Sequence, residues 1–360
     1  MKPADALPHG IRVVDCDVHA AAPDIETLFP YLDDHWQEIA RTTQFRGPTD
    51  TPHPPSAATS LRPDLLGLDP PASSCAEDLA RRVLDPWGTE IALLVCSYAS
   101  EAVKNPDAAV ALSRAVNTWL QQEWLERDPR LRGSIVVPAG QPQLAADEID
   151  RVAEDTRFVQ VLLPVRSFAP YGNRLWLPLL EAAHRHDLVV ALHFGGYPGN
   201  PPTAVGWPTT YVEELVDAPS AFQSQLMSFV AEGVFDRFEG LRVICLESGF
   251  AWMPSLMWRF DRLWRALRRE IPWTRRSPSA YLREHVRLST QPFDVTGAAE
   301  FARIADQIDA PEMLCFATDY PHWHVDDPRE AIPPTDDDGS LRAIMGGNAR
   351  SIYRNRLEGL

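Results

Sequence analysis

Short runs of Val, Ile and Leu recur along the chain and alternate with longer segments whose apolar residues are three or four positions apart. The short runs lack a strict alternation of apolar and polar residues, which is typical of strands buried on both faces. The longer segments have the periodicity of amphipathic helices. We expect eight strands, at residues 11–16, 91–96, 134–138, 158–164, 188–194, 242–247, 286–290 and 314–318.

Helical segments follow these runs one after another. They are expected at residues 23–41, 77–84, 107–127, 145–155, 175–186, 220–235, 252–269, 298–308, 341–345 and 348–353. Eight successive strand–helix units predict an α/β fold, a closed (β/α)8 TIM barrel with long loop insertions at its C-terminal face. The alternative is an open doubly wound sheet, but no G-x-G-x-x-G sequence supports it. We expect one barrel domain over residues 1–360.

Two segments interrupt this pattern. Residues 1–10 are expected to form an N-terminal tail, and residues 44–75 a proline-rich loop insertion. Seven prolines between positions 47 and 71 exclude a regular element there. Because the insertion follows the first strand, we interpret it as a lid over the site, with disorder as the alternative.

Composition limits the partners. The formal net charge of −16 argues against nucleic acid or an anionic membrane, since both need a basic surface. No apolar run is long enough to span a bilayer, and residues 1–10 lack the apolar stretch of a secretion signal. The five cysteines are scattered and form no C-x-x-C pair, which favours a reducing compartment, so we expect a cytoplasmic protein.

Candidate chemistry lies where the predicted strands end. Asp17 and His19 follow the first strand at i, i+2 spacing, which places both side chains on the same face. His193, Glu247 and Asp319 stand at the ends of the fifth, sixth and eighth runs. Functional residues of such barrels lie at the C-terminal ends of the strands, and carboxylates and imidazoles there suit a divalent metal. The alternative is that each is an ordinary turn or loop residue.

The segments VVDCDVH, LPLLEAAHRHDLVVALHFGG, LRVICLESGFAWMP and FATDYPH resemble, in this order, the amidohydrolase superfamily. The resemblance is to its amidohydrolase-2 branch, which contains aminocarboxymuconate-semialdehyde and resorcylate decarboxylases, and extends from residue 14 to about 353. It implies a (β/α)8 barrel with one divalent metal. The implied ligands are Asp17, His19, His193 and Asp319. We expect Zn²⁺, with Mn²⁺ or Fe²⁺ as alternatives.

Two positions depart from the family pattern. The first-strand motif is usually H-x-H or E-x-H, whereas here Asp17 precedes His19. The sixth strand commonly ends in a catalytic histidine, whereas here it ends in Glu247. Crowded carboxylates raise one another's pKa, so we expect Glu247 to stay protonated and to deliver a proton. The alternative for Glu247 is a structural salt bridge at a helix start.

Substrate contacts are expected from loops at the same face. Arg46, Arg62 and Arg166 are candidates to hold a substrate carboxylate. Aromatic side chains after the fifth strand could enclose a flat molecule, and two histidines after the eighth could line the pocket; these are Tyr197, Trp207, Tyr211, His322 and His324. Each of these residues has an ordinary loop or surface role as its alternative.

Three functions follow from this arrangement. We favour hydrolysis of an amide, lactone or related carbonyl of a small flat substrate, with His193 and Asp319 at a metal-activated water and Glu247 returning the proton. The alternative is non-oxidative decarboxylation of an aromatic or enoic acid, which the family favours but the missing sixth-strand histidine weakens. A third reading is a non-catalytic barrel that serves as a binding module. We expect a homodimer, as in many family members.

Overall fold

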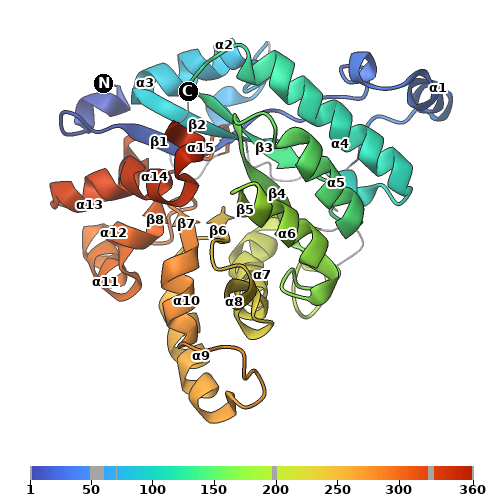
Figure 1. Cartoon of the computed structure of the whole chain (residues 1–360). Helices are drawn as coiled ribbons and strands as arrows, with labels where there is room; N and C mark the ends of the chain where they lie inside the picture. Colours follow the sequence, from blue (N-terminus) through green and yellow to red (C-terminus); the bar gives the residue numbers. More distant parts are fainter. Residues whose placement is uncertain (1, 49–60, 70, 197–200, 323–327, 359–360) are drawn as a thin grey trace.

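The chain forms a barrel of eight parallel strands surrounded by helices (Figure 1). This computed structural model describes residues 2–48, 61–69, 71–196, 201–322 and 328–358. The strands pair in chain order, each with the next. Their bounds are β1 Val13–His19, β2 Thr89–Val95, β3 Leu131–Val136, β4 Phe158–Arg166, β5 Val189–Gly196, β6 Arg242–Leu246, β7 Val286–Ser289 and β8 Leu314–Cys315. The predicted (β/α)8 barrel is confirmed.

The barrel closes between its first and last strands. The Cys16 amide donates to the Phe316 carbonyl at 2.9 Å, and the Asp319 amide donates to the Asp17 carbonyl at 3.0 Å. Strand β8 is shorter than the predicted 314–318 because the residues after Cys315 make single bonds of this kind rather than a continuous ladder. Strand β1 runs three residues beyond its predicted end, so Asp17 and His19 lie within it.

Helices cover the outer face of the strands, and α9 and α10 extend away from the barrel in Figure 1. The larger helices are α1 Asp34–Thr43, α4 Pro106–Leu120, α5 Pro142–Val152, α6 Leu177–Arg185, α7 Tyr211–Ala231, α9 Met253–Leu267, α10 Pro278–His285 and α11 Ala298–Ile308. The shorter ones are α2 Ala76–Leu79, α3 Asp85–Trp87, α8 Val234–Arg237, α12 Ala310–Met313, α13 Asp338–Arg342, α14 Asn348–Tyr353 and α15 Asn355–Glu358. Single 3-10 turns lie at Pro3–Ala6, Phe29–Tyr31, Pro63–Leu65, Ser100–Ala102, Arg174–Trp176 and Pro328–Ala331, and π-helical turns at Ala80–Leu84, Gln121–Leu125 and Ala343–Gly347.

Three of the larger helices differ most from expectation. Helix α1 begins at Asp34 rather than at residue 23. Helix α7 begins at Tyr211 rather than 220, because Thr210 and Glu213 form a capping box at its start and the helix continues through Pro219. Helix α10 was not predicted, because only Tyr281, Leu282 and His285 beside its first-turn proline are buried, too few for a clear periodicity.

The barrel interior is filled by small and branched side chains and is closed at the bottom by the C-terminal helices. Val14, Cys16, Ile244 and Cys315 belong to one buried cluster together with Tyr353 of α14. The Tyr353 hydroxyl donates to the Gln160 side chain in β4. Because this end is plugged, the opposite, C-terminal end of the strands is the face open for a site.

The described ends of the loop insertion contact the segments that follow β1 and β8 at this face. The Arg62 amide donates to the Pro321 carbonyl at 3.1 Å, and the Ala21 amide donates to the Ser73 carbonyl at 2.9 Å. Residues 49–60 lie outside the described part of the chain, so the lid remains a prediction. Within the N-terminal tail, Pro3–Ala6 forms a 3-10 turn. None of the helices that the structure describes is both long and apolar enough to cross a bilayer.

Gly346 lies where the π-helical turn Ala343–Gly347 packs against the start of β1. A Cβ at this position would collide with the carbonyl oxygen of Arg12, whereas a Cβ at Gly347 would meet only the Arg342 carbonyl oxygen at 3.5 Å. Gly346→Ala should therefore lower the free energy of unfolding by about 1–3 kcal/mol, measured by denaturant titration. Gly347→Ala is the matched control and should leave stability unchanged or slightly higher. Equal stability of the two variants would contradict this packing.

Candidate metal centre

Six side chains from four strands converge at the C-terminal mouth of the barrel. Strand β1 supplies two of them, β5 one, the residue after β6 one, and the segment after β8 two. We call them the acid–imidazole cluster: Asp17, His19, His193, Glu247, Asp319 and His322. All except His322, which is partly exposed, are buried. The convergence follows from closure, since residues far apart in sequence end neighbouring strands.

Left-handed backbone turns place the two carboxylates that end β6 and β8. Glu247 has φ 52° and Asp319 has φ 54°, a conformation that costs free energy for residues other than glycine. The Glu247 amide donates to the Ser289 hydroxyl at 3.1 Å, and the Asp319 amide donates to the Asp17 carbonyl. Both strained turns are therefore held by neighbouring strands, as is common at functional sites.

Asp15 fastens β1 to the end of β8. Its carboxylate accepts hydrogen bonds from the Thr318 amide at 3.0 Å and from the Thr318 hydroxyl at 2.6 Å. Asp15 is buried, and burial raises its pKa to about 7. Because Asp17 and Asp319 each lie close in sequence to one member of this pair, the contact fixes their relative position.

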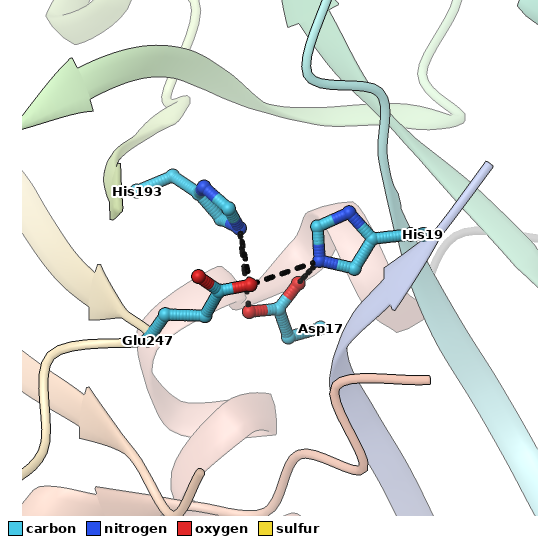
Figure 2. Close-up of side chains that lie close together, drawn as sticks. All are labelled: Asp17, His19, His193 and Glu247. Atoms are coloured by element: carbon cyan, nitrogen blue, oxygen red, sulfur yellow. Dashed lines mark ion pairs between the residues drawn. The ribbon is translucent and has the colours of Figure 1, made fainter. Parts of the chain in front are cut away.

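Glu247 lies at the centre of the cluster. Its Oε1 atom lies 3.3 Å from His19 Nε2 and 3.4 Å from His193 Nε2, and Figure 2 shows how these side chains face one another. Asp17 lies beside both imidazoles, with 3.5 Å between Oδ1 and His19 Nε2 and 3.8 Å between Oδ2 and His193 Nε2. One ligand atom from each of these four residues lies within 4.8 Å of all the others.

Asp319 and His322 complete the other side of the cluster. Asp319 Oδ1 lies 3.0 Å from His19 Nε2 and 2.9 Å from His322 Nδ1. His322 Nδ1 also lies 3.1 Å from Glu247 Oε1. His19, Glu247, Asp319 and His322 therefore form a second group of ligand atoms within 4.8 Å, which shares His19 and Glu247 with the first.

The charges in this cluster shift one another's pKa. Burial alone would raise the pKa of Glu247, but the imidazole of His193 and contacts with His19 and His322 hold it well below its usual range. This direction is opposite to the one expected from the sequence, which counted the carboxylates and omitted the three imidazoles around Glu247. Burial alone would lower the pKa of His193, but the carboxylates of Glu247 and Asp17 raise it to about 10.

The cluster fits a divalent metal ion. Both carboxylate oxygens of Asp17 are buried and accept no hydrogen bond from any described residue. The Nδ1 atom of His193 lies 2.6 Å from the Phe194 carbonyl and donates to it, so Nε2 is the ring nitrogen that faces the cluster. A buried carboxylate without hydrogen bonds is costly unless a cation compensates it. The donor set of carboxylates and imidazoles matches the ligands of one such ion.

Arg166, at the end of β4, is the one predicted substrate-binding arginine that the structure buries near this face. Its side chain is 9% exposed, forms an ion pair with Glu214 of α7, and lies over the Phe194 ring at 5.2 Å. The Nη1 atom of Arg166 is buried and has no hydrogen-bond partner among the described residues. Glu214 gave no signal in the sequence, because its position on α7 resembles that of any helix carboxylate.

The other predicted substrate contacts differ in their surroundings. Arg46 is 80% exposed and pairs with Glu26, and Trp207 is 57% exposed. Arg62 forms an ion pair with Asp64. Tyr211 is the closest of the loop aromatics, since Glu247 and Asp319 add to the effect of burial in raising its pKa. Tyr197 and His324 lie outside the described residues.

A small cavity of about 40 Å³ lies beside His193. Tyr98, Val137, Leu162 and Phe194 are among its lining residues, so its wall is largely apolar. The Tyr98 hydroxyl is buried without a hydrogen-bond partner among the described residues. This tyrosine was not predicted, because it follows β2, whose end offers no ionisable side chain to mark it.

Comparison with known proteins identifies relatives of the whole barrel. Residues 14–354 match the amidohydrolase family. Gamma-resorcylate decarboxylase of Polaromonas sp. is 25% identical over 297 residues, which cover 77% of this chain and 87% of that protein. Among solved structures, 5-carboxyvanillate decarboxylase of Sphingomonas paucimobilis has a TM-score of 0.69 at 19% identity, with 96% of this chain and 99% of that chain covered. A dihydroxybenzoic acid decarboxylase of Polaromonas sp., with bound manganese and 2-nitroresorcinol, has a TM-score of 0.66 at 20% identity, covering 96% and 97%.

These relatives overturn the preference for hydrolysis. The sequence favours a hydrolase because the histidine expected after the sixth strand is missing. The relatives are decarboxylases, and in this structure the imidazole of His322, from the segment after β8, lies 3.1 Å from the Glu247 carboxylate, so an imidazole is present beside the end of β6. The missing histidine is therefore no argument against decarboxylation.

The barrel, the acid–imidazole cluster and the family match over nearly the whole length lead to the same conclusion. The cluster lies at the strand ends where barrels of this kind place their chemistry, and its donor set suits one divalent metal ion. The chain belongs to the amidohydrolase family and is a metal-dependent enzyme of its amidohydrolase-2 branch.

Proposed function

We propose that this chain is a metal-dependent decarboxylase (carboxy-lyase) of a hydroxylated aromatic acid. The observation that supports this most directly is the acid–imidazole cluster at the mouth of the barrel, in which the two Asp17 oxygens accept no hydrogen bond from the described residues. The relatives of this barrel include resorcylate and carboxyvanillate decarboxylases. The largely apolar residues around the small cavity beside His193 support a substrate with a flat, largely apolar ring.

We propose Asp17, His19, His193 and Asp319 as metal ligands. The bound ion would withdraw electron density from a substrate carboxylate and a neighbouring oxygen. Two carboxylates and two imidazoles suit Mn²⁺ as well as Zn²⁺ or Fe²⁺, and we propose Mn²⁺ in place of the Zn²⁺ expected from the sequence. The manganese bound to the Polaromonas decarboxylase supports the same choice.

Asp319 and His322 are proposed to handle the proton. Their Oδ1 and Nδ1 atoms lie 2.9 Å apart, so a proton can be shared between them. His322 is the most exposed member of the cluster and so the one nearest an entering substrate. Decarboxylation replaces the carboxyl group with hydrogen, and this pair would deliver that proton to the ring carbon as CO₂ leaves.

Arg166 is proposed to bind an anionic or hydroxyl group of the substrate. Its Nη2 atom is occupied by Glu214, while its buried Nη1 atom has no described partner. A buried donor without a partner is costly, and a ligand oxygen would compensate it. The guanidinium also lies over Phe194, which lines the cavity, so it stands beside the space proposed for the substrate.

A homodimer is the proposed assembly. Trp258, Leu263 and Leu267 are large, exposed apolar residues on α9, which extends away from the barrel in Figure 1. Burial of such a face against a second copy would remove apolar surface from water. All five cysteines are free, which supports a reducing compartment such as the cytoplasm.

The proposed reaction predicts release of CO₂ from hydroxybenzoates. Protein loaded with Mn²⁺ and incubated with 2,6-dihydroxybenzoate, 5-carboxyvanillate and related hydroxybenzoates should release one CO₂ per aromatic product, measured by isotope-labelled carboxylate. Removal of the metal by a chelator should abolish turnover, and Mn²⁺ should restore it. Asp319→Asn should lower kcat at least about 100-fold, because a general acid–base group contributes that much or more. Metal-loaded protein that hydrolyses amides or lactones and releases no CO₂ from any of these acids would contradict the proposal.

Arg166 and Arg46 form a matched pair for substrate binding. Loss of a charge-assisted hydrogen bond in Arg166→Met should lower kcat/KM for an anionic substrate about 10- to 100-fold, mainly through KM. Arg166→Lys keeps the charge beside Glu214 and should lose less. Arg46→Met, at an exposed position, should match the wild type. An unchanged KM in Arg166→Met, with the melting temperature recorded as a control for folding, would remove Arg166 from the site.

A further inference from the structure

The Glu247 carboxylate is placed differently from one that forms an ordinary ion pair with a single partner. Its Oε1 atom alone faces the three imidazoles, at 3.3 Å from His19 Nε2, 3.4 Å from His193 Nε2 and 3.1 Å from His322 Nδ1. A carboxylate that served only to hold one imidazole would pair with a single ring nitrogen, usually the one that faces away from the cluster. Here His193 already uses its outward nitrogen on the Phe194 carbonyl, and Glu247 approaches the inward one.

The distances around Glu247 match the edges of a coordination shell. Oxygen and nitrogen ligands lie about 2.0–2.2 Å from a divalent metal, so two adjacent ligands are about 3.0–3.5 Å apart. The contacts of Glu247 Oε1 with His19 and His193 fall in this range, as does the 3.5 Å between Asp17 Oδ1 and His19 Nε2. Ligand atoms spaced in this way surround a common point rather than only one another.

A second observation points to a ligand at that point. Asp17 is fully buried, its two oxygens accept no hydrogen bond from the described residues, and both face the same imidazoles as Glu247. The backbone of Glu247 is held in the left-handed region, which an acidic residue adopts at a cost and which the Ser289 hydroxyl supports. The fold therefore maintains a strained residue in order to aim this carboxylate inward.

We propose that Glu247 binds the metal directly, as a ligand additional to Asp17, His19, His193 and Asp319. This inference rests on the metal site of the proposed function and concerns the position that relatives commonly fill with histidine. A third carboxylate makes the donor set richer in oxygen and leaves the site with a net negative charge around a divalent cation.

A crystal structure of the Mn²⁺-loaded protein tests the bond itself. Glu247 Oε1 should lie about 2.2 Å from the ion, the distance of a direct oxygen ligand. In solution, titration of free Mn²⁺ by electron paramagnetic resonance should show that Glu247→Gln weakens metal affinity more than about 10-fold, the least that loss of a ligand's supporting contacts costs. Glu148→Gln is the matched control: this buried carboxylate on α5 bonds Asn117 and Arg151, and its loss should leave Mn²⁺ affinity unchanged.

Failure of this inference is distinguishable from failure of the proposed function. A metal held by Asp17, His19 and His193, with Glu247 more than about 3.5 Å away and unaltered affinity in Glu247→Gln, would overturn direct ligation and leave the decarboxylase proposal intact. A metal bound by Glu247 in a protein that releases no CO₂ would overturn the proposed reaction alone. Binding of Mn²⁺ that none of the cluster variants weakens would overturn both.

Discussion

Six ionisable side chains share one buried space, and most of what distinguishes this barrel follows from the need to balance their charge. Removing a carboxylate from water is costly unless hydrogen bonds or a cation compensate it. Asp17 accepts no hydrogen bond from the described residues, and the imidazoles beside it are its nearest positive groups, since the surrounding carboxylates raise the pKa of His193 to about 10. The cluster therefore attracts positive charge. A divalent ion supplies that charge at the point where the side chains meet.

The barrel supplies the framework that brings these groups together. Asp17 and His19 belong to β1, while Asp319 and His322 follow β8, and closure of the barrel makes these distant segments neighbours. The contact between Asp15 and Thr318 fastens the same two strands just below the cluster. Tyr353 and the C-terminal helices fill the opposite end. Stability is thus concentrated at the bottom and along the strands, which leaves strained turns and uncompensated charge at the top.

Much of this architecture could be predicted from the sequence because burial on both faces leaves a strong signal. Continuous apolar runs marked all eight strands, and their ends marked Asp17, His193 and Asp319 as neighbours before any coordinates. Burial and pairing between distant residues leave no such signal. Arg46 and Arg166 look alike in sequence, but only Arg166 is buried, because Glu214, 48 residues later, compensates its charge. Similarly, the environment of Glu247 depends on His322, which reaches it from another strand.

The choice of reaction shows the same limit. Hydrolysis and decarboxylation can use the same kind of metal site, and they differ in whether the site activates a water or places an acid to protonate a substrate carbon. The sequence locates the strand that lacks a histidine, but not the loop that provides one in space. The relatives, together with the position of His322 beside Glu247 and Asp319, favour decarboxylation.

The metal content of purified protein tests the central claim most directly. Wild type, Asp17→Asn and His193→Ala are each reconstituted with Mn²⁺ and freed of excess ion. Elemental analysis then gives the number of Mn²⁺ ions per chain, which shows whether these two residues hold the ion. One ion per wild-type chain and almost none in either folded variant is the predicted result, with His35→Ala, an exposed imidazole on α1, equal to wild type. Metal-free wild type, or variants that retain a full complement of metal, would contradict a cation at the centre of this cluster.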